Sequence, residues 1–268
     1  MALQGFIAQD RTVLAMTGAD VRAVLQNIVT NDVDAVQPGH AVYAALLTPQ
    51  GKYLFDFFLL NGADFGWGAD DILIDAGAEQ AAALAQRLKM YCLRRKAAVA
   101  AAADLNVALI WGEGEVPGAI RDPRDPALGW RLYGPADQLP DGVTEAPTTD
   151  YDALRVARLV PQTGVELVPD QTYILEAGFE RLSGVDFRKG CYVGQEVTAR
   201  MKHKTELRKG LVQVAVDGAA PAGTAITAGG KPAGTLFTAA DGQALAHLRL
   251  DRAGEGMDAG DAKVHYRK

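Results

Sequence analysis

The sequence contains few cysteines. Cys92 and Cys191 are the only two among 268 residues, and no Cys-x-x-Cys pair occurs. A structural zinc site or a complete iron–sulfur cluster needs more thiolate or imidazole ligands than these two cysteines provide. A disulfide between them is disfavoured in a reducing compartment.

Long apolar segments are also absent. No run reaches the ~18 to 20 apolar residues that a membrane-spanning helix needs, and the first residues, MALQGFIAQDRT, lack the basic and apolar regions of a signal peptide. The formal net charge of −6 disfavours broad attachment to nucleic acid or to anionic membranes. We therefore expect a cytoplasmic protein that does not bind membranes and does not bind nucleic acid directly.

Familiar catalytic signatures are missing as well. The chain has no phosphate-binding GxxxxGK(S/T) loop, no dinucleotide-binding GxGxxG turn, no HExxH zinc motif and no GxSxG nucleophile elbow. Nucleotide hydrolysis, zinc proteolysis and serine hydrolysis therefore have no support in the sequence.

The hydrophobic pattern predicts a mixed α+β body followed by an all-β module. Residues 5–16 read as two short strands, 41–60 as a hairpin around Pro49-Gln50-Gly51, and 71–77 as a further strand. Helices are predicted over 17–32, 78–92, 149–160 (with Asp150 as cap) and 192–204, whereas the alanine-rich stretch 96–105 fits no class. Beyond about residue 207, short β-like runs separated by glycine, proline and aspartate indicate a small barrel or sandwich.

Cys191 lies in the most unusual stretch, KGCYVGQE over residues 189–196. Arg188 and Lys189 precede it, and a helix beginning near Tyr192 would place the thiol at a helix N-terminus. Both features favour the thiolate and should lower the pKa of Cys191. The alternative is a small apolar side chain that fills a turn. Cys92, at the end of a predicted helix, is better explained by packing.

Asp56 and Glu176 stand out as carboxylates in apolar surroundings. Asp56 interrupts YLFDFFLL, and strand alternation places it on one face with Leu54 and Phe58. A buried carboxylate needs a ligand or fixed hydrogen-bond donors, so an inward position would be informative. Solvent-facing positions remain the alternative for both.

Two basic clusters interrupt the acidic background, one at residues 89–96 and one at 200–209. They are either solvated faces or a site for an anionic ligand tail or a stretch of RNA. Glu196 and Arg200 are four residues apart on the predicted helix, which suits a structural ion pair.

KGCYVGQE followed by VTARM closely resembles the signature of the YgfZ family of folate-binding proteins, which includes mitochondrial iron–sulfur assembly relatives. These proteins are similar to the glycine-cleavage T-protein, the tetrahydrofolate-dependent aminomethyltransferase. The segments GADVRAVLQNIVTNDV, LLTPQGKYLFDFFL, YCLRRKAAV and GKPAGTLFTAADGQALAHLRL also resemble the family, so the similarity spans most of the chain.

The resemblance implies a three-domain ring with the folate in a central hole and a small β-barrel as the last domain. We predict an N-terminal folate-binding region at 1–103, a region carrying the motif at 104–205 and the barrel at 206–268. The implied function is that of a tetrahydrofolate-binding accessory protein that helps assemble or repair iron–sulfur enzymes and thereby affects tRNA modification. Its partners would be assembly proteins and client iron–sulfur enzymes.

By position, Cys191 matches the characteristic thiol of the family. Its motif is completed by Lys189, Gly190, Tyr192, Gly194, Gln195 and Glu196, with Arg200 just beyond. Glu176 matches a glutamate that faces the pterin ring in T-proteins. The resemblance thus implies Cys191 and Asp56 as reactive groups, and Glu176, Lys189, Tyr192, Gln195, Glu196 and Arg200 as folate-binding residues. Because one thiol cannot hold a cluster, any iron–sulfur cluster would be shared with a partner.

Two departures from the T-protein pattern argue against classical aminomethyl transfer. The acidic pair after the hairpin is replaced by Phe55-Asp56, and T-proteins lack the cysteine of the motif. A folate-dependent one-carbon transferase that uses Asp56 therefore stands as the second hypothesis. An RNA-binding regulator that uses the basic clusters is the third, and the net charge and lack of an aromatic stacking motif count against it.

Overall fold

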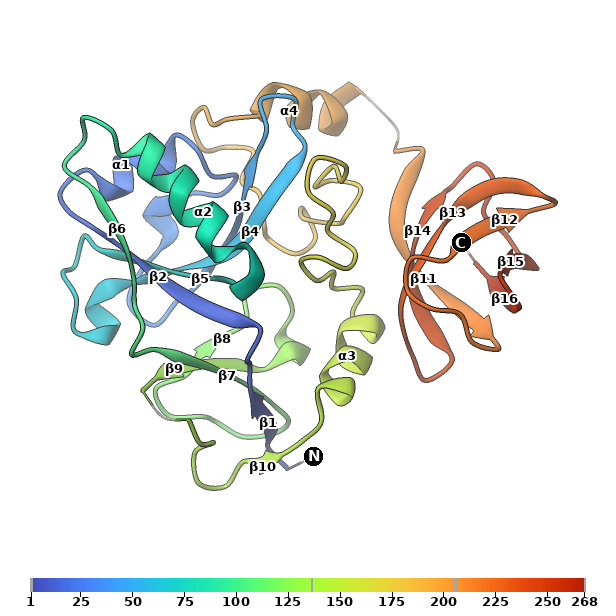
Figure 1. Cartoon of the computed structure of the whole chain (residues 1–268), viewed down its shortest axis with the longest axis horizontal. Coiled ribbons are helices and arrows are strands. Elements are labelled where there is room, and N and C mark those ends of the chain that lie inside the picture. Colours follow the sequence, from blue (N-terminus) through green and yellow to red (C-terminus); the bar gives the residue numbers. More distant parts are fainter. Residues whose placement is uncertain (1, 136, 205–206, 268) are drawn as a thin grey trace.

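The computed structural model describes residues 2–135, 137–204 and 207–267. These residues form two five-stranded sheets and a closed six-stranded barrel, joined by helices and a long irregular segment. Figure 1 shows the barrel at one end of the molecule, with α3 and the irregular segment between it and the two sheets. The part of the chain that the structure describes contains no helix long and apolar enough to span a membrane.

The first sheet is antiparallel in the order β3-β4-β5-β2-β6. Its strands are Val42–Leu47 (β3), Tyr53–Asn61 (β4), Ile72–Gly77 (β5), Arg11–Thr17 (β2) and Ala98–Ala101 (β6). The predicted hairpin is β3 and β4, with Gly51 at a φ of 76° in the turn. The alanine-rich stretch that fits no class from its sequence forms the edge strand β6. Helices α1 (Val21–Gln26) and α2 (Ala78–Tyr91) belong to the same region.

The second sheet has the order β10-β1-β7-β9-β8. Its strands are Thr144–Glu145 (β10), Gln4–Ile7 (β1), Asn106–Trp111 (β7), Trp130–Gly134 (β9) and Ile120–Arg121 (β8). The two strands predicted over residues 5–16 exist as β1 and β2, but they pair in different sheets. β1 therefore lies beside β7, across the predicted domain boundary at 103/104, which stays a prediction.

The C-terminal region closes into a barrel with its own core, as the β-rich pattern indicates. Its strands, in barrel order, are Lys209–Asp217 (β11), Gln243–Arg249 (β14), Lys231–Ala240 (β13), Ala225–Ala228 (β12), Met257–Ala259 (β15) and Ala262–His265 (β16). The predicted boundary at residues 205/206 lies outside the described residues.

Three of the predicted helices begin or end differently in the structure. α1 is much shorter than residues 17–32, because the chain turns after Gln26 and enters the 3-10 turn η1 (Val33–Ala35). Helix α3 (Thr148–Ala157) is preceded by Pro147, so the prediction of Asp150 as its cap is wrong. Helix α4 (Gln195–Lys204) starts three residues after Tyr192, because Gly194 adopts a φ of +85°. Further 3-10 turns are η2 (Gly62–Phe65) and η3 (Pro126–Leu128).

A buried ion network joins the two sheets. Arg131 on β9 is 2% exposed and donates to Asp75 Oδ2 on β5 at 2.6 Å, while Arg11 on β2 donates to Asp75 Oδ1 at 2.7 Å. Arg131 also reaches Asp122 Oδ2 at 3.3 Å, and Arg124 donates to the same oxygen at 2.8 Å. Each buried carboxylate is thus shared by two guanidinium groups, which offsets the cost of burying the charges.

The network keeps its carboxylates ionised. Burial alone would raise the pKa of Asp75, but Arg11 and Arg131 outweigh burial and hold that pKa below its usual value. Arg124 and Arg131 lower the pKa of Asp122 in the same way. A depressed carboxyl pKa stabilises the fold above the unfolded-state pKa of about 3.9, and this stabilisation is lost as the pH falls through the folded-state value.

Replacing Asp75 tests the network. We expect Asp75→Asn to lower the free energy of unfolding by about 3–5 kcal/mol at pH 7, because it leaves Arg131 buried beside a neutral amide. The difference from the wild type should shrink below about pH 4, where the wild-type carboxylate loses its contribution. Denaturant unfolding at a series of pH values measures both effects.

The matched control is Asp251→Asn, which removes an exposed partner of Arg249 and should leave stability unchanged. Equal stability of Asp75→Asn and the wild type at neutral pH would contradict the structural role of the network.

Candidate functional site

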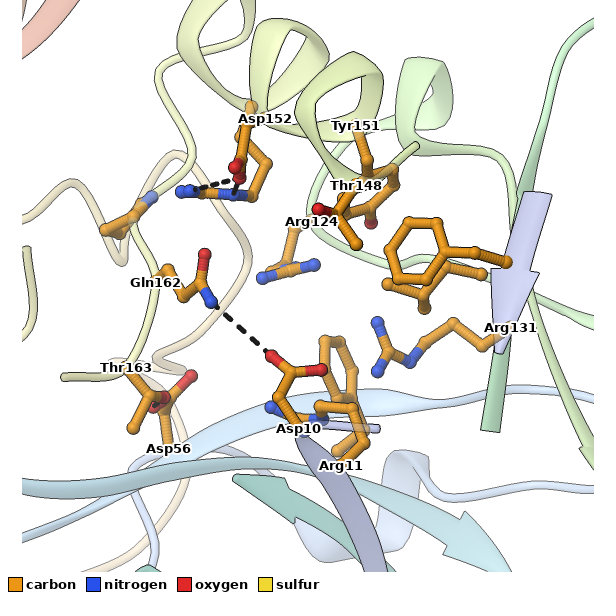
Figure 2. Close-up of a pocket in the computed structure, with 15 residues that line it drawn as sticks. Asp10, Arg11, Asp56, Arg124, Arg131, Thr148, Tyr151, Asp152, Gln162 and Thr163 are labelled. Atoms are coloured by element: carbon orange, nitrogen blue, oxygen red, sulfur yellow. Dashed lines mark hydrogen bonds and ion pairs between the residues drawn. The ribbon is translucent and has the colours of Figure 1, made fainter. Parts of the chain in front are cut away.

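A cavity of about 240 Å³ opens where the two sheets, α3 and the loop at 161–163 converge. We call it the central cavity (Figure 2). Its polar lining consists of Asp10, Arg11, Asp56, Arg124, Arg131, Thr148, Tyr151, Asp152, Arg155, Gln162 and Thr163. Phe6, Phe58 and Leu109 add apolar surface. Segments far apart in the sequence thus combine an aromatic wall with charges of both signs.

Asp56 is a buried carboxylate at the edge of this cavity, 4% exposed. Tyr43 donates to its Oδ2 at 2.9 Å, Tyr53 donates to its Oδ1 at 2.7 Å, and the Thr163 hydroxyl also donates to Oδ1. Burial and the negative charge of Asp56 raise the pKa of both tyrosines, so both hydroxyls stay protonated. Three hydroxyl donors therefore fix the carboxylate, and no cation pairs with it among the described residues.

Tyr151 brings an unused hydrogen-bonding group to the cavity. Its side chain extends from α3, is 5% exposed and lines the central cavity (Figure 2). Its hydroxyl has no hydrogen-bond partner among the described residues. Burial raises the pKa of Tyr151, so the hydroxyl is a protonated donor. A buried polar group without a partner costs about 1–3 kcal/mol.

Arg124 and Arg131 supply positive charge and a cation–π surface on the same wall. Both guanidinium groups lie over the Phe58 ring, with their carbons 4.9 Å and 4.0 Å from its centroid. Asp122 and Asp75 pair with Arg124 and Arg131 and hold them in place. Both arginine side chains line the cavity (Figure 2). The cavity therefore suits a flat polar ring that carries both donors and acceptors.

Glu176 lies in a different cavity, of about 410 Å³, between the irregular segment and the barrel. This barrel-side cavity is lined by residues that include Lys52, Tyr173, Glu176, Arg208 and His247. His247 Nε2 lies 3.1 Å from Glu176 Oε2. Asp56 and Glu176, the two carboxylates singled out from the sequence, therefore do not share a site.

Lys189 is a structural anchor of the motif. Lys189 is 7% exposed, and its ammonium donates to the backbone oxygens of Val29 and Asn31, each at 2.7 Å. Burial lowers the pKa of Lys189 to about 8, against the opposing effect of Asp32 and other nearby carboxylates. The charge that was expected to activate Cys191 is thus bound to the turn that follows α1.

The remaining motif residues divide into buried and exposed groups. Tyr192 is 7% exposed, and burial raises its pKa to about 12. Cys191 and Glu196 are exposed, and Gln195 is half-buried. Arg200 pairs with Glu196 at 2.9 Å, which is the structural ion pair that the spacing favours. Cys191 lines neither cavity, and α4 begins four residues after it.

The sequence patterns did not indicate the arginines and Tyr151 of the central cavity. Asp75 in ILIDAG and Arg131 in WRLYG show the same signal as Asp56, a charge within an apolar strand. That signal identifies Asp56, Asp75 and Arg131 one at a time. It does not show that the three residues lie close together in the fold. Of the residues predicted from the sequence, only Asp56 lines the central cavity, and the folate-binding roles of the others stay predictions.

The barrel and the fold both have known counterparts. Residues 208–268 match the C-terminal beta-barrel domain of CAF17. The chain superposes on the glycine cleavage system aminomethyltransferase T from Bartonella henselae with a TM-score of 0.79 and 16% identity, covering 99% of this chain and 85% of the other. The predicted α+β T-protein fold with a C-terminal barrel is confirmed, and the molecule is a T-protein-like protein by fold.

The sequence relatives are more specific. The chain is 32% identical to the mitochondrial iron–sulfur cluster assembly factor IBA57 of mouse and to that of human, over 94% of this chain and 76% of each relative. An IBA57 homologue from Mycosarcoma maydis is also 32% identical, over 75% of this chain and 54% of that protein. The chain belongs to the IBA57 family of iron–sulfur cluster assembly factors, in agreement with the resemblance seen in its motifs.

The predicted cytoplasmic location is wrong by this comparison, because the relatives are named as mitochondrial proteins. The prediction rested on the absence of long apolar segments and of signal-peptide features in the first residues. Those properties suit any reducing aqueous compartment, so they do not separate the cytoplasm from others.

The two glycines of the motif provide a matched test of how its loop packs. At Gly194, with a φ of +85°, an added Cβ would lie 2.6 Å from the Thr48 oxygen, whereas at Gly190 it would meet nothing within 4 Å. We expect Gly194→Ala to lower the free energy of unfolding by about 1–3 kcal/mol, and Gly190→Ala to change it by less than about 0.5 kcal/mol. Thermal or denaturant unfolding distinguishes them, and equal effects would refute this packing of the loop on the hairpin.

Proposed function

We propose that the protein is an accessory factor in iron–sulfur cluster assembly that binds tetrahydrofolate, or a derivative of it, in the central cavity. The assembly role is supported by the IBA57 relatives, and the folate is suggested by the T-protein fold. Its effect on tRNA modification would be indirect, through iron–sulfur enzymes that depend on it. The observation that carries the folate proposal is the partnerless, buried hydroxyl of Tyr151 in a cavity that also holds Asp56.

The lining fits the head group of a folate. A pterin ring is flat and offers amide and amine hydrogens together with a carbonyl acceptor. Asp10 and Asp152 provide carboxylate acceptors, Tyr151 provides a donor, and the half-buried Phe6 provides an apolar face. The volume of about 240 Å³ lies below the ~300–1,000 Å³ usual for drug-sized ligands, so the enclosed part matches the ring and leaves the tail outside.

Asp56 is better suited to hold a ligand or the cavity wall than to act as a base. Both of its oxygens already accept hydrogen bonds from hydroxyl groups. A proton taken from a substrate would have to compete with these three hydroxyl donors for the carboxylate oxygens. This geometry weighs against the one-carbon transferase hypothesis.

The exposed Cys191 is suited to chemistry with a partner. The described residues contain no group of three or more histidine, cysteine or acidic side chains that could hold a metal ion. An iron–sulfur cluster would therefore be cargo, with Cys191 contributing one ligand and an assembly protein or client enzyme the others. The thiol lies on the surface, where a partner can reach it.

Calorimetric titration with tetrahydrofolate tests the site. We expect Tyr151→Phe to weaken binding about fivefold, since one hydrogen bond to the ligand is worth roughly 1 kcal/mol and tenfold corresponds to 1.4 kcal/mol. Asp56→Asn should weaken binding as well, because it disturbs three hydroxyl groups at the cavity. Glu176→Gln is the matched control in the barrel-side cavity and should bind like the wild type.

If Glu176→Gln weakens folate binding and Tyr151→Phe does not, the folate site is the barrel-side cavity and not the central cavity. Undetectable binding by the wild type would overturn the folate proposal. Cys191→Ser separates the second half of the proposal: it should fold and bind folate normally but fail to support iron–sulfur enzyme activity in cells that lack the wild-type protein. If Cys191→Ser fully supports iron–sulfur enzyme activity in these cells, the Cys191 thiol is not needed for the function.

A further inference from the structure

The end of α2 presents an exposed surface that neither cavity uses. We call it the α2-end patch. It consists of the exposed side chains of Lys89, Met90, Leu93, Arg94, Arg95 and Lys96. Figure 1 shows this end of α2, and β6 beyond it, on the side of the molecule away from the barrel.

The patch has an apolar centre. Met90 is 63% exposed and Leu93 is 73% exposed, whereas Leu88 and Cys92 on the other side of the same segment are buried against the sheet. Across the described residues, the only other large apolar side chain with comparable exposure is Trp67, at 37%. Single exposed apolar residues are ordinary. Two neighbouring exposed apolar side chains flanked by basic residues are a feature of binding surfaces.

The backbone that carries the patch is fixed. Arg94 adopts a φ of 63°, an unusual conformation for a residue with a side chain, and Arg95 N donates to the Cys92 oxygen at 2.9 Å. Lys96 N donates to Asp20 Oδ2 at 2.7 Å, and Asp20 N donates to the Lys96 oxygen at 3.1 Å. The turn is therefore clamped at both ends, so Leu93 is held outward before any partner binds.

The charges of the patch are available to a partner. Lys89, Arg94, Arg95 and Lys96 make no ion pair within the described ranges, in contrast to Arg200 and Lys202 of the other basic cluster, which pair with Glu196 and Glu180. Four unpaired cations on a protein of net charge −6 give a local positive field within an acidic surface.

The patch leads directly into an open sheet edge. β6 is the last strand of the first sheet and contains only alanine and valine. Ala102 N donates inward to the Val13 oxygen, so alternation turns the backbone groups of Val99 and Ala101 outward. Natural edge strands are protected by short length, charged residues, proline or a bulge. β6 is four residues long and carries neither charge nor proline, so its length is its main protection.

We propose that the α2-end patch and β6 form a docking site for an acidic, extended segment of a partner protein. The segment adds a strand to β6, its apolar side chains cover Met90 and Leu93, and its carboxylates face Arg94 and Arg95. This mode uses backbone hydrogen bonds for affinity and the cationic, apolar patch for specificity. It is independent of the folate site and of Cys191.

Other occupants fit less well. A lipid bilayer would leave the outward backbone groups of β6 without hydrogen-bond partners. Nucleic acid offers no apolar side chain for Met90 and Leu93, and the patch has no exposed aromatic ring for base stacking. A second copy of the chain would bring a second set of the same cations to the interface.

Fluorescence anisotropy with a synthetic probe tests the proposal on the full chain. The probe is a labelled strand-length peptide that alternates glutamate with valine or leucine. We expect the peptide to bind at least about tenfold more tightly than its lysine counterpart. Arg95→Glu and Leu93→Gln should each weaken binding about tenfold, and added salt should weaken it as well. A probe methylated on the backbone nitrogens of one edge should lose binding.

Lys231→Glu, which makes the same change of charge at an exposed site on the barrel, is the matched control and should bind like the wild type. Three results would overturn the proposal: equal binding of acidic and basic probes, full binding by the backbone-methylated probe, or full binding by Arg95→Glu. The proposal would also be overturned if the protein does not bind the peptide but binds anionic phosphatidylserine vesicles or RNA, and if Leu93→Gln abolishes that binding. A Leu93-dependent dimer in sedimentation would overturn it as well, if the peptide does not bind.

Discussion

The contact between Arg131 and Asp75 determines how the two sheets meet. Arg131 lies on β9 of one sheet and Asp75 on β5 of the other. Arg11, on β2, donates to the second oxygen of the Asp75 carboxylate. A charge this deeply buried has only one low-energy arrangement, in which every oxygen and guanidinium nitrogen faces its partner. The cavity wall depends on that arrangement, because Arg131 lies over the Phe58 ring in the cavity lining.

The interior cavity and the exposed motif loop are joined by continuous contacts. Tyr43 donates through its hydroxyl to Asp56 at the cavity and accepts through its backbone oxygen from Asn31. The backbone oxygen of Asn31 in turn accepts from Lys189, two residues before Cys191. The protein thus places a ligand-sized interior site and a surface thiol on one rigid frame, an arrangement suited to a factor that holds a small molecule inside and meets protein partners outside.

Local patterns in the sequence predicted the local features well. Alternation along β4 placed Asp56 on one face with Leu54 and Phe58 but left its burial open, and the structure buries it. Pro49-Gln50-Gly51 located the hairpin. The patterns failed where distant segments decide the outcome: β1 and β2 read as neighbours but pair in different sheets, and 56 residues separate Asp75 from Arg131. Lys189 was read as a neighbour of Cys191, but its ammonium binds the turn at Val29 and Asn31, which no local spacing reveals.

We propose that folate binds between the two sheets and not beside the barrel. Amide hydrogen exchange measured with and without tetrahydrofolate tests it most directly, because the two cavities are lined by different peptides. We predict slower exchange in residues 53–61, 120–131 and 148–163 on addition of the ligand, with residues 235–247 unchanged. Slower exchange confined to residues 166–176 and 235–247 would contradict it.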